Sequence, residues 1–413
     1  MAYETLRKLY YKNNELYKGV YRQRFNDAQT IKLDFDVHDK QAFFIPGVDV
    51  LELVVKIERL DKDVRDLSKK LPGVAKNQYS KKCLIDEIVL TNKIEGVYSS
   101  RQEIGDVLDA LEERSASVKK RERFIGLVQK YLKLINGETI QLAQCQDIRD
   151  IYDELVLEEV LAENAKNYPD GQFFRQHETA VYSATDKIIH RGLMPESKII
   201  EAVNKALAFM NNSEVDYLYR ICLFHYMIGY IHPFYDGNGR LARFILSYYI
   251  TEHFEPLLAY RISETIKENI KAYYDAFELC NDPRNLGDLT PFLLMMLNMI
   301  LQAITELKGA LSRKLYRWEQ YERLIPEMAG VGAHQNLCEL YSRLIQAGLF
   351  SERGISMKML QQTLNLSANT IKGLLEQVSS KGYLVKMKHS KSYYYQINLD
   401  LLDKLQFEKE ILD

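Results

Sequence analysis

The stretch that decides the fold is His232-Pro233-Phe234-Tyr235-Asp236-Gly237-Asn238-Gly239-Arg240-Leu241-Ala242-Arg243. An apolar run over 215–231 precedes it and predicts a long helix, and a second helix is expected to run from the loop to Thr251. Between them, Asp236 to Gly239 are turn formers that let consecutive backbone N–H groups face one point. We therefore expect an anion to bind where the loop becomes helix.

The same loop contains the residue types that phosphate chemistry needs. His232 is a titratable imidazole, Asp236 is a hard oxygen ligand for Mg²⁺, and Arg240 and Arg243 lie three residues apart on one helix face. Phosphoryl or nucleotidyl transfer needs such a base, metal ligand and cationic donors. A short Asp-Gly-Asn-Gly alone is also compatible with a tight turn between solvated arginines.

The full stretch resembles the signature of the Fic family, H-x-F-x-[D/E]-G-N-G-R-x-x-R, at every specified position. The resemblance implies a protein adenylyltransferase that moves AMP from ATP to a Ser, Thr or Tyr hydroxyl of a target protein. One branch of the family phosphorylates instead, but it departs from this pattern. ATP and Mg²⁺ are therefore expected, while another nucleotide donor stays open.

The resemblance also implies a role for each position of the loop. His232 would deprotonate the target hydroxyl, Phe234 would anchor the loop in the core, and Asp236 would hold Mg²⁺ between the α- and β-phosphates. Arg240 would contact the β-phosphate region and Arg243 the γ-phosphate. The backbone of the loop and the Asn238 side chain would receive phosphate oxygens, and the remaining nucleotide-binding positions are Gly237, Gly239, Leu241 and Ala242.

A second motif lies upstream. Thr91-Asn92-Lys93-Ile94-Glu95-Gly96 resembles the family's inhibitory motif, [S/T]-x-x-x-E-[G/N]. In relatives with an N-terminal inhibitory helix this Glu pairs with the second motif arginine, which implies that Glu95 and Arg243 form a lock. Taken alone, the segment also fits an exposed Glu before a helix-capping Gly. Whether Glu95 only inhibits, or also orients water for AMP removal, stays open.

Two further segments resemble parts of the family's nucleotide site. Residues 173–193 alternate polar and apolar residues and predict a hairpin where the family has its flap. The nucleotide-side strand would carry Thr179, Ala180, Val181 and Tyr182, and Tyr182-Ser183-Ala184 replaces the usual Val-Gly-Gly. Tyr273, Tyr274 and Asn281 resemble adenine-side residues, although tyrosines at helical spacing are also typical of a core.

The rest of the chain predicts a mainly α protein, because apolar residues recur every three or four positions through the first 310 residues. We expect a helical N-terminal region over 1–90, a Fic catalytic domain over 91–311 and a connecting helix over 312–334. Helices over 335–349, 355–364 and 368–381, followed by two strands within 383–397, predict a winged helix-turn-helix-like domain over 335–413.

This last domain has two interpretations. Residues 351–400 carry seven Lys or Arg against three Asp or Glu, with Lys386, Lys388 and Lys391 on the expected wing, which suits contacts with DNA phosphates. The expected recognition helix has no arginine, and winged helices also serve as protein-docking or dimerisation modules. DNA binding and protein contact, including a homodimer, stay open. The alternative function is a DNA-binding transcriptional regulator whose Fic domain senses nucleotide.

Composition limits the cellular setting. The 413 residues are 46% hydrophobic and 27% charged, as in a folded globular protein, and 55 basic against 57 acidic residues give no global basic field. The five cysteines lie far apart without C-x-x-C spacing, so we expect a reducing cytoplasm. The apolar run 292–304 is short and interrupted by Asn298 and Gln302, so no membrane contact is expected.

Overall fold

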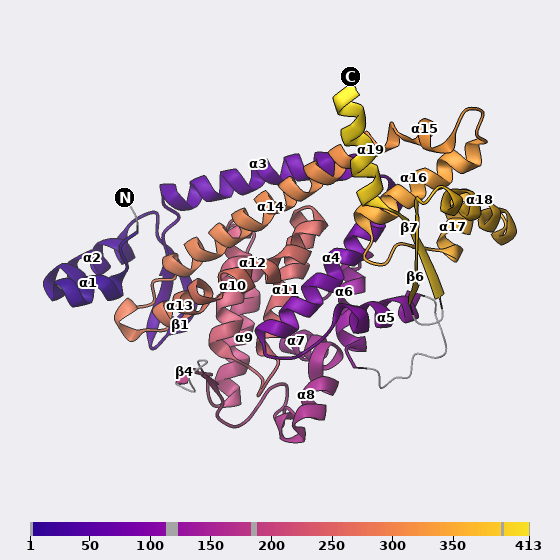
Figure 1. Ribbon diagram of the computed structural model, residues 1–413. Helices are drawn as coiled ribbons and strands as arrows, with labels where there is room; N and C mark the ends of the chain where they lie inside the picture. The colour runs from indigo at the N-terminus through magenta and orange to yellow at the C-terminus, as the bar shows by residue number, and fades with distance from the viewer. Residues whose placement is uncertain (1–2, 113–122, 183–187, 390–391, 413) are drawn as a thin grey trace. The chain divides into compact units, whose positions relative to one another are not determined.

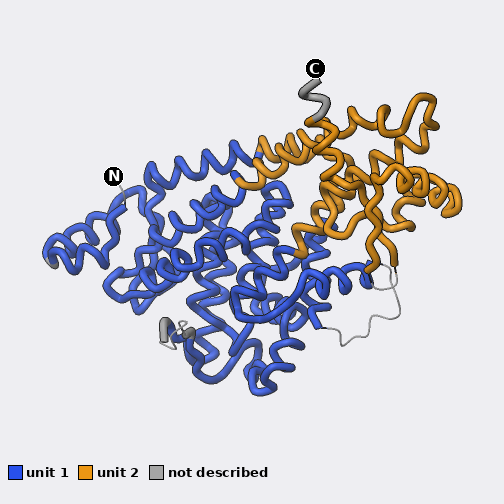
Figure 2. Tube along the Cα trace, viewed as in Figure 1, with its two compact units in different colours: residues 1–61, 86–305 blue, residues 62–85, 306–413 orange. Residues whose placement is uncertain are grey.

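The computed structural model describes residues 3–112, 123–182, 188–389 and 392–412 (Figure 1). Helices dominate, and the three small sheets are antiparallel, which confirms the predicted mainly α class. The chain divides into two compact units (Figure 2). Unit 1 contains Met1–Asp61 and Asp86–Thr305, and unit 2 contains Lys62–Ile85 and Glu306–Asp413. This division differs from the four consecutive regions predicted from the sequence, because each unit is assembled from two separate segments.

The centre of unit 1 is a pair of buried helices, α10 (Tyr217–Ile231) and α11 (Asn238–His253), joined by the motif loop. The Asp216 side chain caps α10 by accepting a hydrogen bond from the Leu218 N–H. Nearly every side chain of both helices is buried, which explains why their sequences are apolar on all faces rather than amphipathic. The loop is thus held between two helices that water does not reach.

The N-terminal region is not purely helical as predicted. After α1 (Leu6–Lys12) and α2 (Asn14–Asn26), strands β1 (Ile31–Val37) and β2 (Lys40–Phe44) form an antiparallel hairpin. Its two turn residues, His38 and Asp39, have φ of 48° and 62°, the left-handed pair that a tight hairpin turn requires. His-Asp is not the usual Asn-Gly signal for this turn, so the sequence pattern did not predict the hairpin.

Around the central pair, unit 1 contains helices, one π-helical turn and a second hairpin. The hairpin predicted over 173–193 is confirmed as β3 (Ala180–Tyr182) and β4 (Ile188–Arg191), which pair antiparallel. The other elements are α5 (Arg101–Glu112), α6 (Ile125–Ile135), α7 (Cys145–Tyr152), the π-helical turn η1 (Asp153–Leu157), α8 (Glu158–Glu163), η2 (Ala165–Asn167), α9 (Glu196–Met210), η3 (Pro256–Arg261), α12 (Ile262–Glu268), α13 (Ile270–Cys280) and η4 (Pro283–Asn285).

Three long helices contribute residues to both units: α3 (Val48–Lys70), α4 (Gly73–Ile94) and α14 (Thr290–Glu322). We expected a helix to end near Leu311 and a separate connecting helix to follow, but α14 continues unbroken to Glu322, and α15 (Ile325–Ala329) comes next. Among the described residues, α14 alone is long and apolar enough to cross a membrane by length and composition. Phe292, Leu297 and Leu307 of this helix are fully buried in the protein.

The C-terminal part of unit 2 follows the predicted order of elements. It consists of α16 (Gln335–Phe350), α17 (Met357–Leu364), α18 (Ala368–Ser380), β6 (Leu384–His389) and β7 (Ser392–Ile397). A short strand, β5 (Ile355–Ser356), pairs with β7 to give the order β5-β7-β6, and α19 (Leu399–Leu412) ends the chain. Neither β5 nor α19 was predicted, because a two-residue strand has no period and the last helix is only weakly amphipathic. Lys391 of the expected wing lies outside the described residues.

Candidate active site

The motif loop is shaped by its own residues. His232 ends α10 with a left-handed backbone, φ 51°, and Gly237 precedes α11 with φ 77°. A Cβ on Gly237 would lie 3.0 Å from a methyl group of Val156, so glycine is needed there. The Asn238 amide accepts from the Phe234 N–H (2.9 Å) and donates to the Phe234 carbonyl (2.8 Å). In the structure the amide oxygen and nitrogen close the loop, and Asn238 also lines a pocket beside it; its predicted contact with phosphate oxygens stays a prediction.

Phe234 fixes the loop to the core. Its ring is fully buried, stacks on Tyr152 with centroids 3.6 Å apart, and meets Phe174 edge-on at 5.5 Å. The aromatic contacts are made by one side chain within an otherwise polar loop, as the sequence indicated. The buried ring therefore fixes the position of the neighbouring polar residues of the loop relative to the core.

His232 has a strongly altered basicity. Burial, together with the neighbouring His190 and Arg175, lowers its pKa to about 3. The half-buried imidazole is therefore neutral near pH 7 and can accept a proton. Its position depends on Arg175, which is fully buried and donates to three backbone carbonyls: His232 at 2.9 Å, Leu193 at 2.9 Å and His177 at 2.7 Å. The sequence offered no signal for this role of Arg175, because its partners are backbone atoms.

Arg243 is held by the upstream motif. Its guanidinium lies 2.8 Å from the Glu95 carboxylate, and it donates to the Thr91 hydroxyl (2.7 Å) and carbonyl (3.0 Å). Arg243 and Thr91 are buried, whereas the Glu95 side chain is 24% exposed at the end of α4. The predicted pairing of Glu95 with Arg243 is therefore present in the structure.

The Glu95 carboxylate also covers the first turn of α11. A Cβ placed on Gly239 would overlap both Glu95 carboxylate oxygens. This is the helix N-terminus at which the sequence predicted an anion. An anionic side chain therefore occupies that position, and glycine at 239 is what allows its close approach.

Arg240 faces a different partner. Its guanidinium is 1% exposed and lies 2.8 Å from the Glu159 carboxylate of α8. We expected Arg240 at the β-phosphate region; the structure pairs it with a carboxylate that the sequence did not single out. Burial raises the pKa of Glu159 to about 7, although Arg240 opposes the rise.

A pocket opens between the loop and the residues predicted on the adenine side. It is lined by Glu95, His190, His225, Gly229, His232, Asn238, Gly239, Ala242, Arg243, Tyr273, Tyr274, Phe277 and Asn281. Four separate segments of sequence, 95, 190, 225–243 and 273–281, thus come together around one space. Leu241 was predicted among the nucleotide-binding residues, but its side chain is fully buried, does not line the pocket and serves the core.

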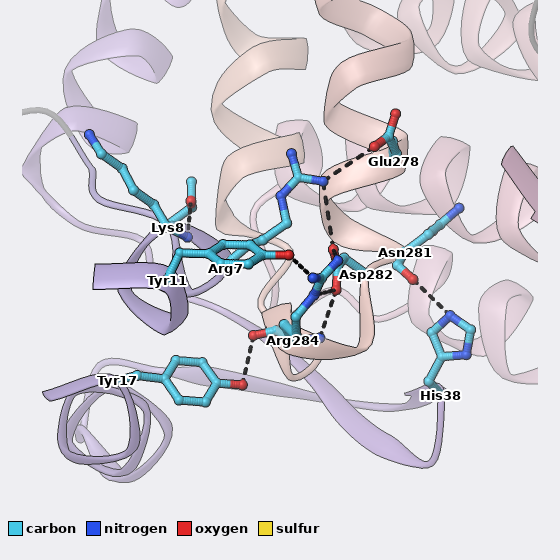
Figure 3. A network of polar contacts seen from close by, with 10 residues as sticks. Arg7, Lys8, Tyr11, Tyr17, His38, Glu278, Asn281, Asp282 and Arg284 are labelled. Carbon is cyan, nitrogen blue, oxygen red and sulfur yellow. Dashed lines mark hydrogen bonds and ion pairs between the residues drawn. The ribbon is translucent and has the colours of Figure 1, made fainter. Parts of the chain in front are cut away.

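The adenine-side residues are tied into a network. Tyr273 shares a 2.7 Å hydrogen bond with His225, whose other ring nitrogen meets the Ala242 carbonyl, and burial lowers the pKa of His225 to about 4. The Asn281 side chain accepts from Tyr226, and its carbonyl lies 2.7 Å from the His38 ring of the unpredicted hairpin turn (Figure 3). Tyr274 is 38% exposed at the pocket edge.

The flap strand is only partly described. Thr179 precedes β3, and its hydroxyl lies 3.5 Å from the Tyr235 carbonyl. Ala180 pairs with Arg191 and Val181 with His190, and Tyr182 ends the strand. Ser183 and Ala184, which replace the family's glycines, lie outside the described residues.

The donor set near Asp236 fits a magnesium ion bound together with phosphates. Among the described residues no three His, Cys, Asp or Glu side chains are grouped as a protein-only metal site. Mg²⁺ in nucleotide sites is commonly held by one or two carboxylates and completed by phosphate oxygens and water. The half-buried Asp236 carboxylate beside the α11 N-terminus, with the buried Tyr152 hydroxyl and Arg240 Nε lacking partners, suits that arrangement.

Together, the two buried helices, the glycine-rich loop and the hairpin define a protein with the Fic fold. Residues 143–250 match the model of the Fic/DOC family, so the chain carries a Fic/DOC family domain over this stretch.

Three solved structures are similar to this chain, and the first of them supports the Fic fold. A Fic family protein from Desulfovibrio desulfuricans G20 is 19% identical over 85% of this chain and 96% of its own, with a TM-score of 0.50. Fic-1 from C. elegans is 18% identical over 75% of this chain and 81% of its own, with a TM-score of 0.42. A Fic domain containing signaling protein from Bacteroides thetaiotaomicron is 16% identical over 62% and 97%, with a TM-score of 0.43.

Proposed function

We propose that this protein is an adenylyltransferase that transfers AMP from ATP to a Ser, Thr or Tyr hydroxyl of a target protein, and that Glu95 restrains it. The observation that carries the proposal is the position of the Glu95 carboxylate, which lies over Gly239 and pairs with Arg243 at the N-terminus of α11. A site built to hold an anion there, filled by a side chain at the end of another helix, is suited to exchanging that side chain for a phosphate.

The chemistry follows from the groups around the loop. The neutral His232 takes the proton of the incoming hydroxyl, whose oxygen then bonds to the α-phosphorus of ATP as the bond to the pyrophosphate oxygen breaks. Backbone N–H groups at the start of α11 and the Arg243 guanidinium receive the negative charge of the phosphates. Mg²⁺ bound by Asp236 would neutralise charge on the departing pyrophosphate.

Glu95 and the γ-phosphate compete for the same guanidinium. A phosphate oxygen placed on the side of the Arg243 guanidinium that now faces Glu95 would meet the negative charge of that carboxylate, so productive seating of the γ-phosphate requires Glu95 to move away. Because its side chain is partly exposed and lies next to Gly96, where α4 has ended, Glu95 can be hydrated when it leaves.

The test uses Mg²⁺ and ATP labelled at the α-phosphate, with wild type, Glu95→Gly and Glu95→Gly/His232→Ala. We expect Glu95→Gly to label itself or an added protein at least about tenfold faster than wild type, the effect of about 1.4 kcal/mol on the barrier. The double variant should show no labelling while still binding ATP, because the anion site does not need the imidazole. Equal silence of wild type and Glu95→Gly, with ATP bound, would contradict the proposal.

A second candidate is a DNA-binding regulator, favoured by the surface of unit 2. Lys358 of α17, Lys372 of α18 and Lys386 and Lys388 of β6 are all exposed, on a helix, helix, helix and hairpin order that we propose to be a winged helix. Binding to random duplex DNA should weaken steeply as salt rises. Absence of binding at low salt would exclude this candidate.

A further inference from the structure

Two buried polar atoms beneath the motif loop have no partner in the described part of the protein: the Arg240 Nε and the Tyr152 hydroxyl. Both belong to side chains that are almost completely buried. Leaving such atoms without a hydrogen bond costs free energy, so a native structure that keeps them usually fills them with water, an ion or a ligand.

Both residues contact or belong to the motif loop: Tyr152 stacks on Phe234 and lies against Gly237, and Arg240 is in the first turn of α11. Burial raises the pKa of Tyr152, and the next largest influences on this hydroxyl are the charges of Asp236 and Arg240. The Tyr152 ring is fixed by its stacking on Phe234. Asp236, Tyr152 and Arg240 therefore form one cluster under the loop, on residues that do not line the pocket with Glu95 and Arg243.

Glu159 holds Arg240 in this cluster. The pair is 2.8 Å apart, and both side chains are buried, at 1% and 8% exposure. Separating a buried pair leaves an unpaired charge in the interior, which is strongly destabilising. Arg240 cannot, therefore, leave Glu159 to reach a ligand, and any contact that it makes must come from this paired position.

Tyr152 and Glu159 come from α7 and α8, two elements of one helical segment. The π-helical turn η1, Asp153–Leu157, interrupts the helical segment between Tyr152 and Glu158. A π turn holds more residues than an α turn and therefore rotates the following residues about the helix axis. Residues seven positions apart lie within about 20° of each other around a regular α-helix, so Tyr152 and Glu159 would share a face even without the turn. Tyr152 contacts Phe234 of the loop, and Glu159 holds Arg240.

We propose that Glu159 is a positioning residue for phosphate transfer: it fixes Arg240 so that the free Nε and the Tyr152 hydroxyl face the phosphates, or their bound water, at the loop. This inference rests on the proposed function and deepens it. Glu159 differs from Glu95 in that it stays in place while the nucleotide is bound, because Arg240 is buried and remains paired with it.

The test replaces Glu159 by Gln in the Glu95→Gly background, which preserves the shape of the side chain and removes its charge. We expect the labelling rate at saturating ATP to fall at least about tenfold, with the Kd for ATP changed less than about threefold, since binding depends mainly on the other pocket. Glu163→Gln, an exposed carboxylate on the same helix, is the matched control and should leave both values unchanged. A labelling rate that rises would make Glu159 a second lock, and an unchanged rate would leave it a purely structural partner; either result overturns the proposal.

A spectroscopic measurement distinguishes a failure of this positioning proposal from a failure of the proposed adenylyl transfer. In protein with ¹⁵N-labelled arginine, the Arg240 Nε–H resonance is assigned by its loss in Arg240→Lys. We expect it to shift when a non-hydrolysable ATP analogue and Mg²⁺ are added to Glu95→Gly, and to shift much less in Glu95→Gly/Glu159→Gln. If Glu95→Gly never labels but this response is seen, adenylyl transfer fails while the positioning of Arg240 stands. If Arg240 does not respond to the analogue, the positioning proposal is wrong whatever the activity.

Discussion

The two arginines of α11 lie one helical turn apart, and each is paired with a glutamate at 2.8 Å, yet the two pairs differ in their surroundings. Glu159 is inside a helix and 8% exposed, and Arg240 has no other carboxylate at this distance among the described residues. Glu95 ends its helix and is 24% exposed, and Arg243 keeps two further bonds to Thr91. The comparison teaches that burial, rather than distance, separates a permanent contact, Glu159–Arg240, from an exchangeable one, Glu95–Arg243.

The largest expected effect concerns stability. Glu159→Ala should lower the free energy of unfolding by about 3–5 kcal/mol, because it leaves the Arg240 charge buried and unpaired. Glu95→Ala should lower it by about 1 kcal/mol or less, since Thr91 still holds Arg243 and the lost carboxylate was partly hydrated. Urea unfolding followed by circular dichroism measures both variants. Equal losses would remove the distinction between the two pairs.

Measuring stability as a function of pH tests the buried Glu159–Arg240 pair alone. The folded-state pKa of Glu159 is raised from 4.5 to about 7, so the folded protein retains this proton where the unfolded chain has lost it. The contribution of Glu159 to stability should therefore fall as pH rises from about 4.5 to about 7 and stay constant above. The total change is about 3–4 kcal/mol, for a rise of about 2.5 pKa units at 1.36 kcal/mol per unit.

The measurement is the difference in unfolding free energy between wild type and Glu159→Gln at pH values across that range. Wild type should lose stability relative to the variant as pH rises. A difference that does not change with pH would mean that Glu159 is ionised throughout and that Arg240 outweighs burial.

The smallest expected effect on activity concerns Thr91, which supports Arg243 in the exchangeable Glu95–Arg243 pair. Thr91→Val keeps the side-chain shape but removes the hydroxyl that accepts from Arg243, at a cost of about 1–2 kcal/mol in stability. Arg243 then rests on Glu95 and the Thr91 carbonyl, so we expect basal labelling by otherwise wild-type protein to rise a few-fold. Thr91→Ser retains the hydroxyl and should behave as wild type. If both variants label alike, the hydroxyl does not contribute to holding Arg243.

The exchangeable pair, Glu95–Arg243, could be predicted from the sequence, whereas the permanent pair, Glu159–Arg240, could not. Glu95 and Arg243 each lie in a motif whose spacing marks them, and the structure brings them together. Glu159 follows another glutamate in an ordinary helical stretch, and no motif or periodicity in that stretch marks it as the partner of Arg240. The charge of Arg240 was visible, but its partner is eighty-one positions away.

The fold shows the same limit. The helices around the loop were predicted within a few residues, because they are apolar or amphipathic over many turns. The hairpin at β1 and β2 was missed, since its turn is made by His38 and Asp39 rather than by glycine or asparagine. That turn brings the His38 ring to the Asn281 carbonyl, a contact between distant segments that local pattern does not encode (Figure 3).

The number of residues along helix α4 fixes the directions of Thr91 and of the helix end that carries Glu95. The helix is unbroken from Gly73 to Ile94, and one turn before Thr91 the Glu87 carboxylate accepts hydrogen bonds from the Ser263 hydroxyl (2.6 Å) and N–H (3.0 Å). Each residue inserted into an α-helix turns everything beyond it by about 100° and displaces it by about 1.5 Å. With Glu87 bound to Ser263, a single residue inserted between Glu87 and Thr91 would turn Thr91 and the helix end that carries Glu95 away from Arg243. The number of residues between Glu87 and Glu95 is as much a part of this site as their identity.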